Sequence, residues 1–449
     1  MRLAKEESGQ QLLTMAILLI TLIAFVGLAV NGGMAFITKA RLSKSVDAAC
    51  LAGMRALPQG QTVATSLATH IFNANYGANP PTPSITFPVD GYGDKQVQVS
   101  ASTPVPNFFA PHMFPVWNVA DTGVATRGKL VMELVLDRSG SMQNNDGWSA
   151  LKAAVPSFVD DFDNTQDSVG MISFASNATI DFSINTNFQT PINNVVNGWT
   201  QSTFSGGTFG TGGTYVASDG PPLAMADHQI GTVPILTGQN VTRVAVYFTD
   251  GLMNTIQDNF TCYTSSTAHA TYMLNYGGYD TGTNEVDVFD PLKGTDLCPY
   301  EGYGQCLNPS QGYSVSNIVY SSAEKVCQNP WGTYVTKFPS QQLGQTTINR
   351  ANVTTEAQYR ALQTANTMRN ETPGVYIFVI GLGSQISGST STQAFLKNLA
   401  NDPTSSSYNA NLPVGQLFIV PDCPSSTCTQ ELNTAFQTIA AKILLRLTQ

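Results

Sequence analysis

The chain has 449 residues, of which 42% are hydrophobic and 11% are charged, and its formal net charge is -9. A chain of this length and apolar content can form two or three domains with buried cores, which argues against a mostly disordered protein. The sequence contains no basic block that could neutralise a phosphate backbone, so we exclude nucleic acid as a partner.

The first predicted element is a transmembrane helix. No charged residue occurs in residues 11–38, and the apolar run at 12–30 is long enough to cross a hydrocarbon layer. A cleaved secretory signal is the alternative, but this run exceeds the usual apolar core of a signal, and no Ala-x-Ala-like site follows it. We therefore predict a cytoplasmic tail at residues 1–10 and a membrane span at residues 11–33.

The cysteines bear on which side of the membrane the body lies. Cys50 stands near the span, and the other six are Cys262, Cys298, Cys306, Cys327, Cys423 and Cys428. Six distal cysteines suit three disulfides in an oxidising compartment, although their pairing cannot be read from sequence and buried free thiols remain an alternative. Basic residues flank the span on both sides, so charge alone does not decide its orientation. The cysteines favour an extracytoplasmic body.

Residues 34–127 are predicted to form a small membrane-proximal α+β region. Apolar residues recur there at spacings of three and four, which puts them on one face of a helix that continues from the span: Leu42, Val46, Ala49, Cys50, Met54 and Leu57. Pro58 and Gly60 end this helix. A simple stalk is one interpretation, and a pilin-like helix packing on a small sheet is the other. Residues 96–103 alternate polar and apolar side chains, as a half-buried strand does.

Residues 128–449 are predicted to form a doubly wound α/β domain with a mostly parallel, Rossmann-like sheet. Short apolar runs rich in β-branched residues alternate with helical stretches, at 130–136, 168–174, 243–248 and 374–380. Runs of this kind are typical of parallel strands that are covered on both faces.

The α/β pattern is interrupted at residues 257–346. This stretch is rich in Gly, Tyr, Asn and Ser and contains four cysteines. It is too polar to build a large core of its own, so we interpret it as a disulfide-rich insertion that is rigidified by its bridges.

Oxygen-bearing side chains follow two of the predicted strands. The first strand leads into Asp137, Ser139 and Ser141, an Asp-x-Ser-x-Ser sequence, and the strand at 243–248 leads into Asp250. Thr214 follows a pair of glycines and precedes a helical stretch. Open α/β sheets place ligand sites at the carboxyl ends of their strands. Hydroxyls and a few carboxylates are ligands for a hard cation such as Mg²⁺, although each group alone could instead cap a helix.

In order and in context, these five residues closely resemble the metal-ion-dependent adhesion site of the von Willebrand factor A family. The resemblance extends from Leu130 to the C-terminus apart from the insertion, and includes a closing strand at 416–420 and a final helix at 431–447. It implies that Ser139, Ser141 and Thr214 contact Mg²⁺, Mn²⁺ or Ca²⁺ directly or through water. It also implies that Asp137 and Asp250 hold the cation through waters, and that an acidic side chain of a protein partner completes its coordination.

The N-terminal region carries a second resemblance. An uncharged span followed by Ala40-Arg41-Leu42 and by the sequence Ser-Val-Asp-Ala-Ala at 45–49 resembles the TadE/TadG-like proteins of Flp (tight-adherence) pilus assembly. Members of the TadG type also join such an anchor to a von Willebrand factor A domain. A pilin-type processing site would have Glu five residues after the cleaved glycine, but the fifth residue after Gly9 is Thr14. This departure argues against cleavage, so we expect the span to be a retained, single-pass membrane anchor.

Together these features predict a bacterial membrane protein that binds other proteins and is not an enzyme. Its expected partners are Tad pilus-assembly proteins, other envelope proteins or a surface ligand with an acidic side chain. The alternative is a structural subunit in which the metal only stabilises the fold. A phosphatase using Asp137 as nucleophile would need a second Asp where Ser139 stands. The Gly381-Leu382-Gly383 sequence lacks the third glycine of a dinucleotide loop.

Overall fold

The computed structural model divides into two compact units, residues Met1–Gly128 with Thr448–Gln449, and residues Lys129–Leu447. The structure describes residues 3–105, 116–144, 147–175, 178–203, 221–253, 255–258, 272–275, 287–290, 295–296, 327–328, 334–335, 337–342, 344–347, 350–421 and 427–447.

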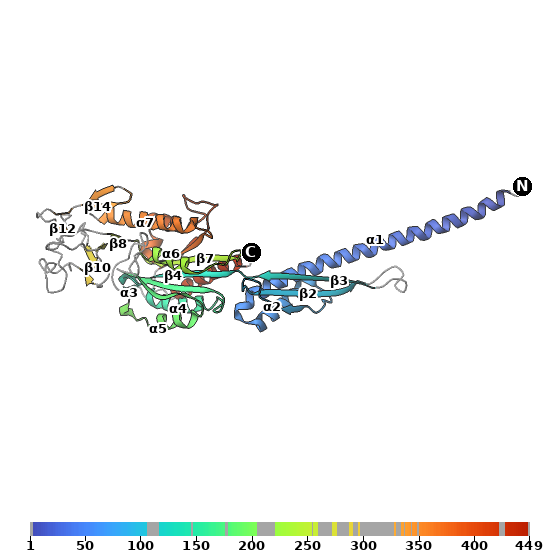
Figure 1. Ribbon diagram of the computed structural model, residues 1–449, viewed down its shortest axis with the longest axis horizontal. Helices are drawn as coiled ribbons and strands as arrows, with labels where there is room; N and C mark the ends of the chain where they lie inside the picture. Colours follow the sequence, from blue (N-terminus) through green and yellow to red (C-terminus); the bar gives the residue numbers. More distant parts are fainter. Residues whose placement is uncertain are drawn as a thin grey trace. The chain divides into compact units, whose positions relative to one another are not determined.

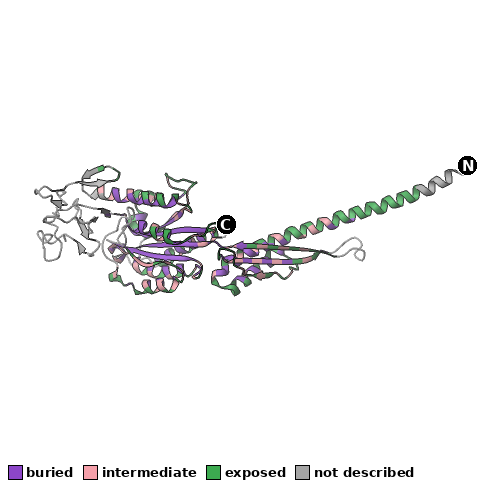
Figure 2. Cartoon of the chain, viewed as in Figure 1, coloured by how far each residue is buried: buried purple, intermediate pink, exposed green. Residues whose placement is uncertain are grey.

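The first unit is built on one long helix. Helix α1 (Leu3–Ala56) contains an uncharged, largely apolar stretch at residues 11–38, most of which is exposed (Figure 2). Its most apolar 18-residue window has a mean hydropathy of 2.7 with 6% of the window buried. This helix is long and apolar enough to cross a membrane. A short 3₁₀ turn, η1 (Leu57–Gln59), contains the predicted stop at Pro58.

The second half of α1 packs on a small antiparallel sheet. Its strands are β1 (Ser84–Thr86), β2 (Gln96–Val105) and β3 (Trp117–Thr126), in the order β1-β2-β3. The predicted apolar face of α1 is buried against β2 and β3, as is the free thiol of Cys50. The helix therefore packs on a sheet, as the pilin-like interpretation expects, rather than forming a bare stalk.

Helix α2 (Gln61–Tyr76) was not predicted from the sequence. Half of its 16 residues are apolar, and the buried ones form a narrow stripe of Ala64, Ala68, Phe72 and Tyr76. Gly60, with φ of 108°, adopts a backbone conformation that side chains disfavour and lets the chain turn between the two helices. Apolar pairs at 63–64, 67–68 and 71–72 recur every four residues, which was the available sequence signal for this helix, and the buried stripe packs on α1.

The second unit is an α/β layer structure around a six-stranded sheet (Figure 1). The strands are ordered β17-β16-β7-β4-β5-β6. Their bounds are β4 (Lys129–Asp137), β5 (Ser168–Phe174), β6 (Ala178–Asn185), β7 (Val241–Thr249), β16 (Val375–Leu382) and β17 (Gln416–Val420). All neighbours are parallel except β5 and β6, which pair antiparallel. The predicted mostly parallel sheet is confirmed.

Helices cover both faces of this sheet. Helices α3 (Gly140–Asn144), α4 (Gly147–Val159), α5 (Gln189–Gly198) and α10 (Cys428–Arg446) contribute to the core on one face. Helices α6 (Pro222–Thr232), α7 (Arg350–Asn370), α8 (Ser384–Ser387) and α9 (Thr390–Ala400) contribute to the core on the other. Every residue of β5 and β7 is buried, which explains the nearly continuous apolar runs of these strands. The 3₁₀ turn η2 (Gln201–Thr203) follows α5.

The segment between β7 and α7 does not join the central sheet. Strands β8 (Thr255–Asp258), β9 (Tyr272–Asn275), β10 (Asp287–Asp290) and β11 (Thr295–Asp296) form an antiparallel sheet in the order β11-β10-β9-β8. Two further pairs are formed by β12 (Cys327–Gln328) with β13 (Tyr334–Val335) and by β14 (Lys337–Ser340) with β15 (Gly344–Thr347).

The disulfides of this segment stay a prediction, because the side chains of its four cysteines lie outside the described residues. Cys428, at the start of α10, is disulfide-bonded. It belongs to the closing helix of the domain and not to the insertion.

A buried carboxyl interrupts the apolar centre of the sheet. Glu133 on β4 is fully buried, and neither of its carboxyl oxygens has a hydrogen-bond partner. Burial, and then the negative charge of Asp181, raise the pKa of Glu133 well above its ordinary value. Gly170, its partner on β5, leaves the space for this carboxyl, since a Cβ there would collide with it.

Replacing this carboxyl with an apolar group should stabilise the domain. We expect Glu133→Met to raise the free energy of unfolding by about 1–3 kcal/mol. Met has a side chain of similar length to Glu, and it removes the unsatisfied buried carboxyl. The folded-state pKa of Glu133 lies above the unfolded value, so this carboxyl destabilises the folded state increasingly as pH rises above the unfolded pKa. The stability gained by Glu133→Met should increase over the same pH range. Urea unfolding across this pH range measures the effect. Glu133→Gln, which keeps a buried polar group, should gain less, and a destabilised Met variant would contradict the argument.

Candidate functional site

The candidate site lies at the carboxyl ends of two adjacent strands, β4 and β7. Strand β4 ends at Asp137, and the chain passes through Ser139 into α3; strand β7 ends at Thr249, followed by Asp250. The two strands pair in parallel, from Lys129 with Val241 to Leu136 with Phe248. This register brings their ends together, so residues more than a hundred positions apart in sequence become neighbours.

Two serine hydroxyls converge on one carboxylate oxygen. Ser141 Oγ donates to Asp250 Oδ1 at 2.8 Å, and Ser139 Oγ lies 3.3 Å from the same oxygen. The two hydroxyl oxygens are 3.0 Å apart. Three of the five predicted site residues therefore form one compact cluster, within the reach of a single hydrated cation.

Asp137 holds the two loops in place. Its Oδ1 accepts a hydrogen bond from the backbone N–H of Ser139 at 2.8 Å, and its Oδ2 accepts one from Thr249 Oγ1 at 2.7 Å. Asp137 is fully buried, and Ser139 and Asp250 are 1% and 3% exposed. Because both oxygens of Asp137 are bonded within the protein, its carboxylate orients the Ser139 loop and would act on a cation through an intervening water.

The second oxygen of Asp250 points to a cationic ligand. Asp250 Oδ2 is buried and has no hydrogen-bond partner, which is costly for a carboxylate. A divalent cation would satisfy this oxygen. The donor set of hydroxyls and carboxylates also fits Mg²⁺, Mn²⁺ or Ca²⁺ better than a soft metal. Among the described residues, no group of three or more His, Cys, Asp and Glu side chains offers a different metal site.

Burial and mutual repulsion perturb both carboxyls. Burial, and then the charge of Asp137, raise the pKa of Asp250 to about 7, against the opposing effect of hydrogen bonds from Ser141 and Ser139. Burial also raises the pKa of Asp137, while hydrogen bonds from Ser139 and Thr249 oppose the shift. Two buried carboxyls in contact with one loop favour a shared proton or a cation between them.

Thr214, the fifth predicted residue, lies outside the described residues. Two neighbours that the sequence analysis assigned no role belong to the site's framework. Thr249 links the two strand ends, and its position directly before Asp250 was the available signal. Arg138 donates from Nε to Ser173 Oγ at 2.7 Å and from Nη1 to the carbonyl of Thr203 at 3.2 Å. It thereby fixes η2 beside the Ser139 loop.

Family comparisons agree with this architecture. Residues 132–252 match the von Willebrand factor type A domain model. The match contains β7, most of β4 and the positions of all five predicted site residues. This part of the chain is therefore similar to von Willebrand factor type A (vWA) domains. Residues 9–56 match the putative Flp pilus-assembly TadE/G-like family. An apolar helix with a TadE/G-like match fits a membrane-anchored protein with an extracellular body.

Several solved structures resemble the chain at low sequence identity. The PilB minor pilin from Streptococcus sanguinis is 13% identical, with a TM-score of 0.40 and coverage of 82% of this chain and 79% of that chain. The vWF domain of the type V pili tip protein Mfa5 from Porphyromonas gingivalis is 16% identical, with a TM-score of 0.37 and coverage of 72% and 98%.

A third similar structure is proximal thread matrix protein 1 from the mussel byssus, described with a zinc-occupied MIDAS motif. It is 13% identical, with a TM-score of 0.34 and coverage of 71% of this chain and 46% of that chain. No curated protein matches the chain significantly.

The raised pKa of Asp250 predicts a pH dependence for the vWA domain without metal. Its folded-state pKa of about 7 exceeds the ordinary value of 3.8, so the folded chain binds a proton that the unfolded chain releases. This contribution to stability is fully present below the unfolded pKa and is lost as pH rises through about 7. We therefore expect this group to make the wild type more stable as pH is lowered from about 8 to about 5. Thermal unfolding in chelator measures the change.

The matched variant is Asp250→Asn, which should show a smaller change over the same range because it cannot take up this proton. Mg²⁺ should bind the wild type more tightly at about pH 8 than at about pH 6, since the cation competes with the proton. Equal pH profiles for wild type and variant would contradict the assignment.

Proposed function

We propose that this chain is a membrane-anchored, extracytoplasmic vWA protein of Flp/Tad pilus assembly or surface adhesion. It binds protein partners through a divalent cation held at Asp137, Ser139, Ser141, Thr214 and Asp250. The protein is a binding module and not an enzyme. The observation that carries the proposal is the convergence of Ser139 and Ser141 on Asp250, whose second oxygen is buried and without a hydrogen-bond partner.

The role of each group follows from its contacts. The hydroxyls of Ser139 and Ser141 are already aimed at one point, so they would bind the cation with little rearrangement. Asp250 supplies negative charge, and Asp137 fixes the loop that carries the serines. When bound, the cation supplies a positive charge that can accept an acidic side chain of a partner. Thr214 is included in the proposed site only because its position in the sequence resembles the family motif.

A structural subunit is the second candidate. In that case the cation joins the ends of β4 and β7 and stabilises the fold, while partners bind elsewhere. The buried, partly unsatisfied carboxyls favour this role as well, because any cation that neutralises them stabilises the domain. Capture of a partner and stability of the domain therefore have to be measured separately.

Partner capture should depend on the metal. We expect the full chain in detergent to retain partners from envelope extracts in Mg²⁺ and to lose them in chelator. Ser141→Ala should weaken capture by about tenfold or more, which corresponds to about 1.4 kcal/mol or more of binding free energy. Ser406→Ala is the matched control, because Ser406 is exposed in the loop between α9 and β17.

The two candidates differ in their outcomes. If Mg²⁺ raises the unfolding temperature but capture is the same in chelator and in Ser141→Ala, the cation is structural. If capture follows the metal and the variant, the adhesion function is supported.

The segment after the site is proposed to select the partner. Strand β8 begins five residues beyond Asp250, so this segment leaves the domain near the site. Its sequence is rich in tyrosine, at Tyr263, Tyr272, Tyr276, Tyr279, Tyr300, Tyr303 and Tyr313. Long insertions on a rigid scaffold often carry recognition, and tyrosines supply contact area at low entropic cost. The alternative is that these rings only pack the insertion on its own domain.

Deleting the segment should separate metal binding from recognition. We expect replacement of residues 259–336 by a short Gly/Ser linker to leave Mg²⁺ affinity nearly unchanged and to abolish partner capture. These boundaries keep β8, whose Ile256 is 1% exposed in the core, and the β14–β15 hairpin, where Gln341 N–H donates to Glu356 on α7. Titration with Mg²⁺ and the capture assay measure the two effects. Undiminished capture would place recognition elsewhere.

A further inference from the structure

The end of β3 carries apolar side chains that the first unit leaves exposed. Val116, just before the strand, is 57% exposed, and Trp117, its first residue, is 36% exposed. Contact of this apolar surface with water is unfavourable unless something covers it. The neighbouring stretch of α1 is also exposed, with Phe36 at 75% and Ile37 at 56%.

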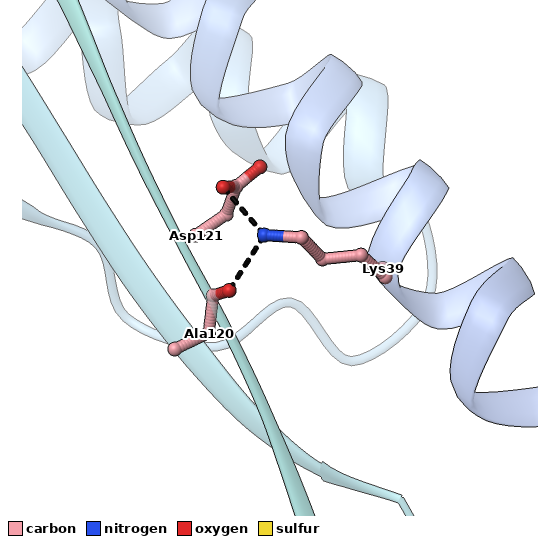
Figure 3. A network of polar contacts seen from close by, with 3 residues as sticks. All are labelled: Lys39, Ala120 and Asp121. Atoms are coloured by element: carbon pink, nitrogen blue, oxygen red, sulfur yellow. Dashed lines mark hydrogen bonds and ion pairs between the residues drawn. The ribbon is translucent and has the colours of Figure 1, made fainter.

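Two contacts show that β3 and α1 run in the same direction. Lys39 Nζ donates to the carbonyl oxygen of Ala120 at 2.7 Å and to Asp121 Oδ1 at 2.6 Å (Figure 3). Two residues further along β3, a Cβ on Gly123 would lie 2.8 Å from Val46 Cγ1. Later residues of β3 therefore lie beside later residues of α1. The start of β3 must point toward the apolar, N-terminal half of the helix (Figure 1).

The same contacts give the level that Trp117 reaches along the helix. The Ser43 hydroxyl also lowers the pKa of Asp121, so it lies close to this carboxyl, and this part of β3 lies beside that turn of α1. The four residues from Asp121 back to Trp117 span about 13 Å, which equals about nine residues of helix. Trp117 is therefore level with about Met34, inside the stretch that carries no charged residue before Lys39.

Lys39 fixes this arrangement at the first charged position after the apolar stretch. Its hydrogen bond to Asp121 lowers the pKa of that carboxyl. An exposed ion pair of this kind contributes little to the free energy of folding. Its second bond, to the Ala120 carbonyl, nevertheless holds the backbone of β3 against α1 where the helix leaves its apolar stretch.

We propose that the β3 end, formed by Val116 and Trp117, inserts into the headgroup–acyl boundary of the membrane that α1 crosses. This inference rests on the membrane anchoring in the proposed function. Tryptophan favours this boundary because its ring is apolar and its indole N–H can still bond to headgroups or water. A lipid surface is favoured over a protein partner because the β3 end is level with exposed Phe36 and Ile37 and continuous with the apolar half of α1. The membrane thus contacts two elements of the first unit, which restricts its tilt.

Quenching by brominated lipid tests this contact. The full chain is reconstituted into phosphatidylcholine vesicles with or without bromine on the acyl chains, and flotation of the vesicles reports anchoring independently. We expect bromine to reduce the tryptophan emission of the wild type. In Trp117→Phe the bromine-dependent loss should disappear. Trp148→Phe, which changes a tryptophan on α4 of the second unit, should retain it.

Each outcome bears on the inference. If the chain floats and Trp117→Phe loses the bromine-dependent quenching, the β3 end contacts lipid. If the chain floats but bromine quenches the variant as much as the wild type, or quenches neither, the β3 end faces water or a protein and the inference is wrong while the anchor stands. A chain that does not float would overturn the anchor and the inference together.

Discussion

The carboxyl group of Asp137 joins the ends of two central strands, and the candidate site depends on this joint. One oxygen accepts the Ser139 N–H and the other accepts the Thr249 hydroxyl, so the loop after β4 is tied to the end of β7. The sheet makes this possible, because parallel pairing in register ends both strands at the same edge. Full burial of Asp137 strengthens these bonds, since water does not compete for them.

The same burial makes the site costly without a ligand. Asp137 and Asp250 are buried carboxyls on neighbouring loops, and one oxygen of Asp250 has no hydrogen-bond partner. A protein that maximised its own stability would avoid this arrangement. Glu133, deeper on β4, is a second unsatisfied carboxyl, but its surroundings in the middle of the strand are those of a closed core. The two carboxyls therefore differ: Asp250, at the strand end, could bind a cation, while Glu133, in the middle of β4, only destabilises the fold.

Helix α1 combines two environments in one element. Residues 12–37 carry exposed apolar side chains, as a membrane span requires, and the later part of the helix buries a narrow apolar face against α2 and the small sheet. The change occurs near Lys39. Before it, from residue 11 on, the helix is uncharged and largely apolar on all sides, and after it the buried apolar residues recur at spacings of three and four, on one face of the helix. A continuous helix across this point transmits the orientation of the span to the packed half without a flexible joint.

Local patterns in the sequence determined the apolar stretch of α1, the buried strands of the α/β domain and the cluster of oxygen-bearing side chains after β4. The strands were readable because burial on both faces leaves a continuous apolar run. The strand predicted at 416–420 is β17, and the helix predicted at 431–447 begins three residues earlier as α10. Only the tertiary structure decided which groups meet. Ser141 and Asp250 are 109 positions apart, and their contact depends on the pairing of β4 with β7. The bond of Thr249 to Asp137 and the position of Trp117 along α1 escaped the sequence for the same reason: both depend on contacts with distant residues, which no short window of sequence contains.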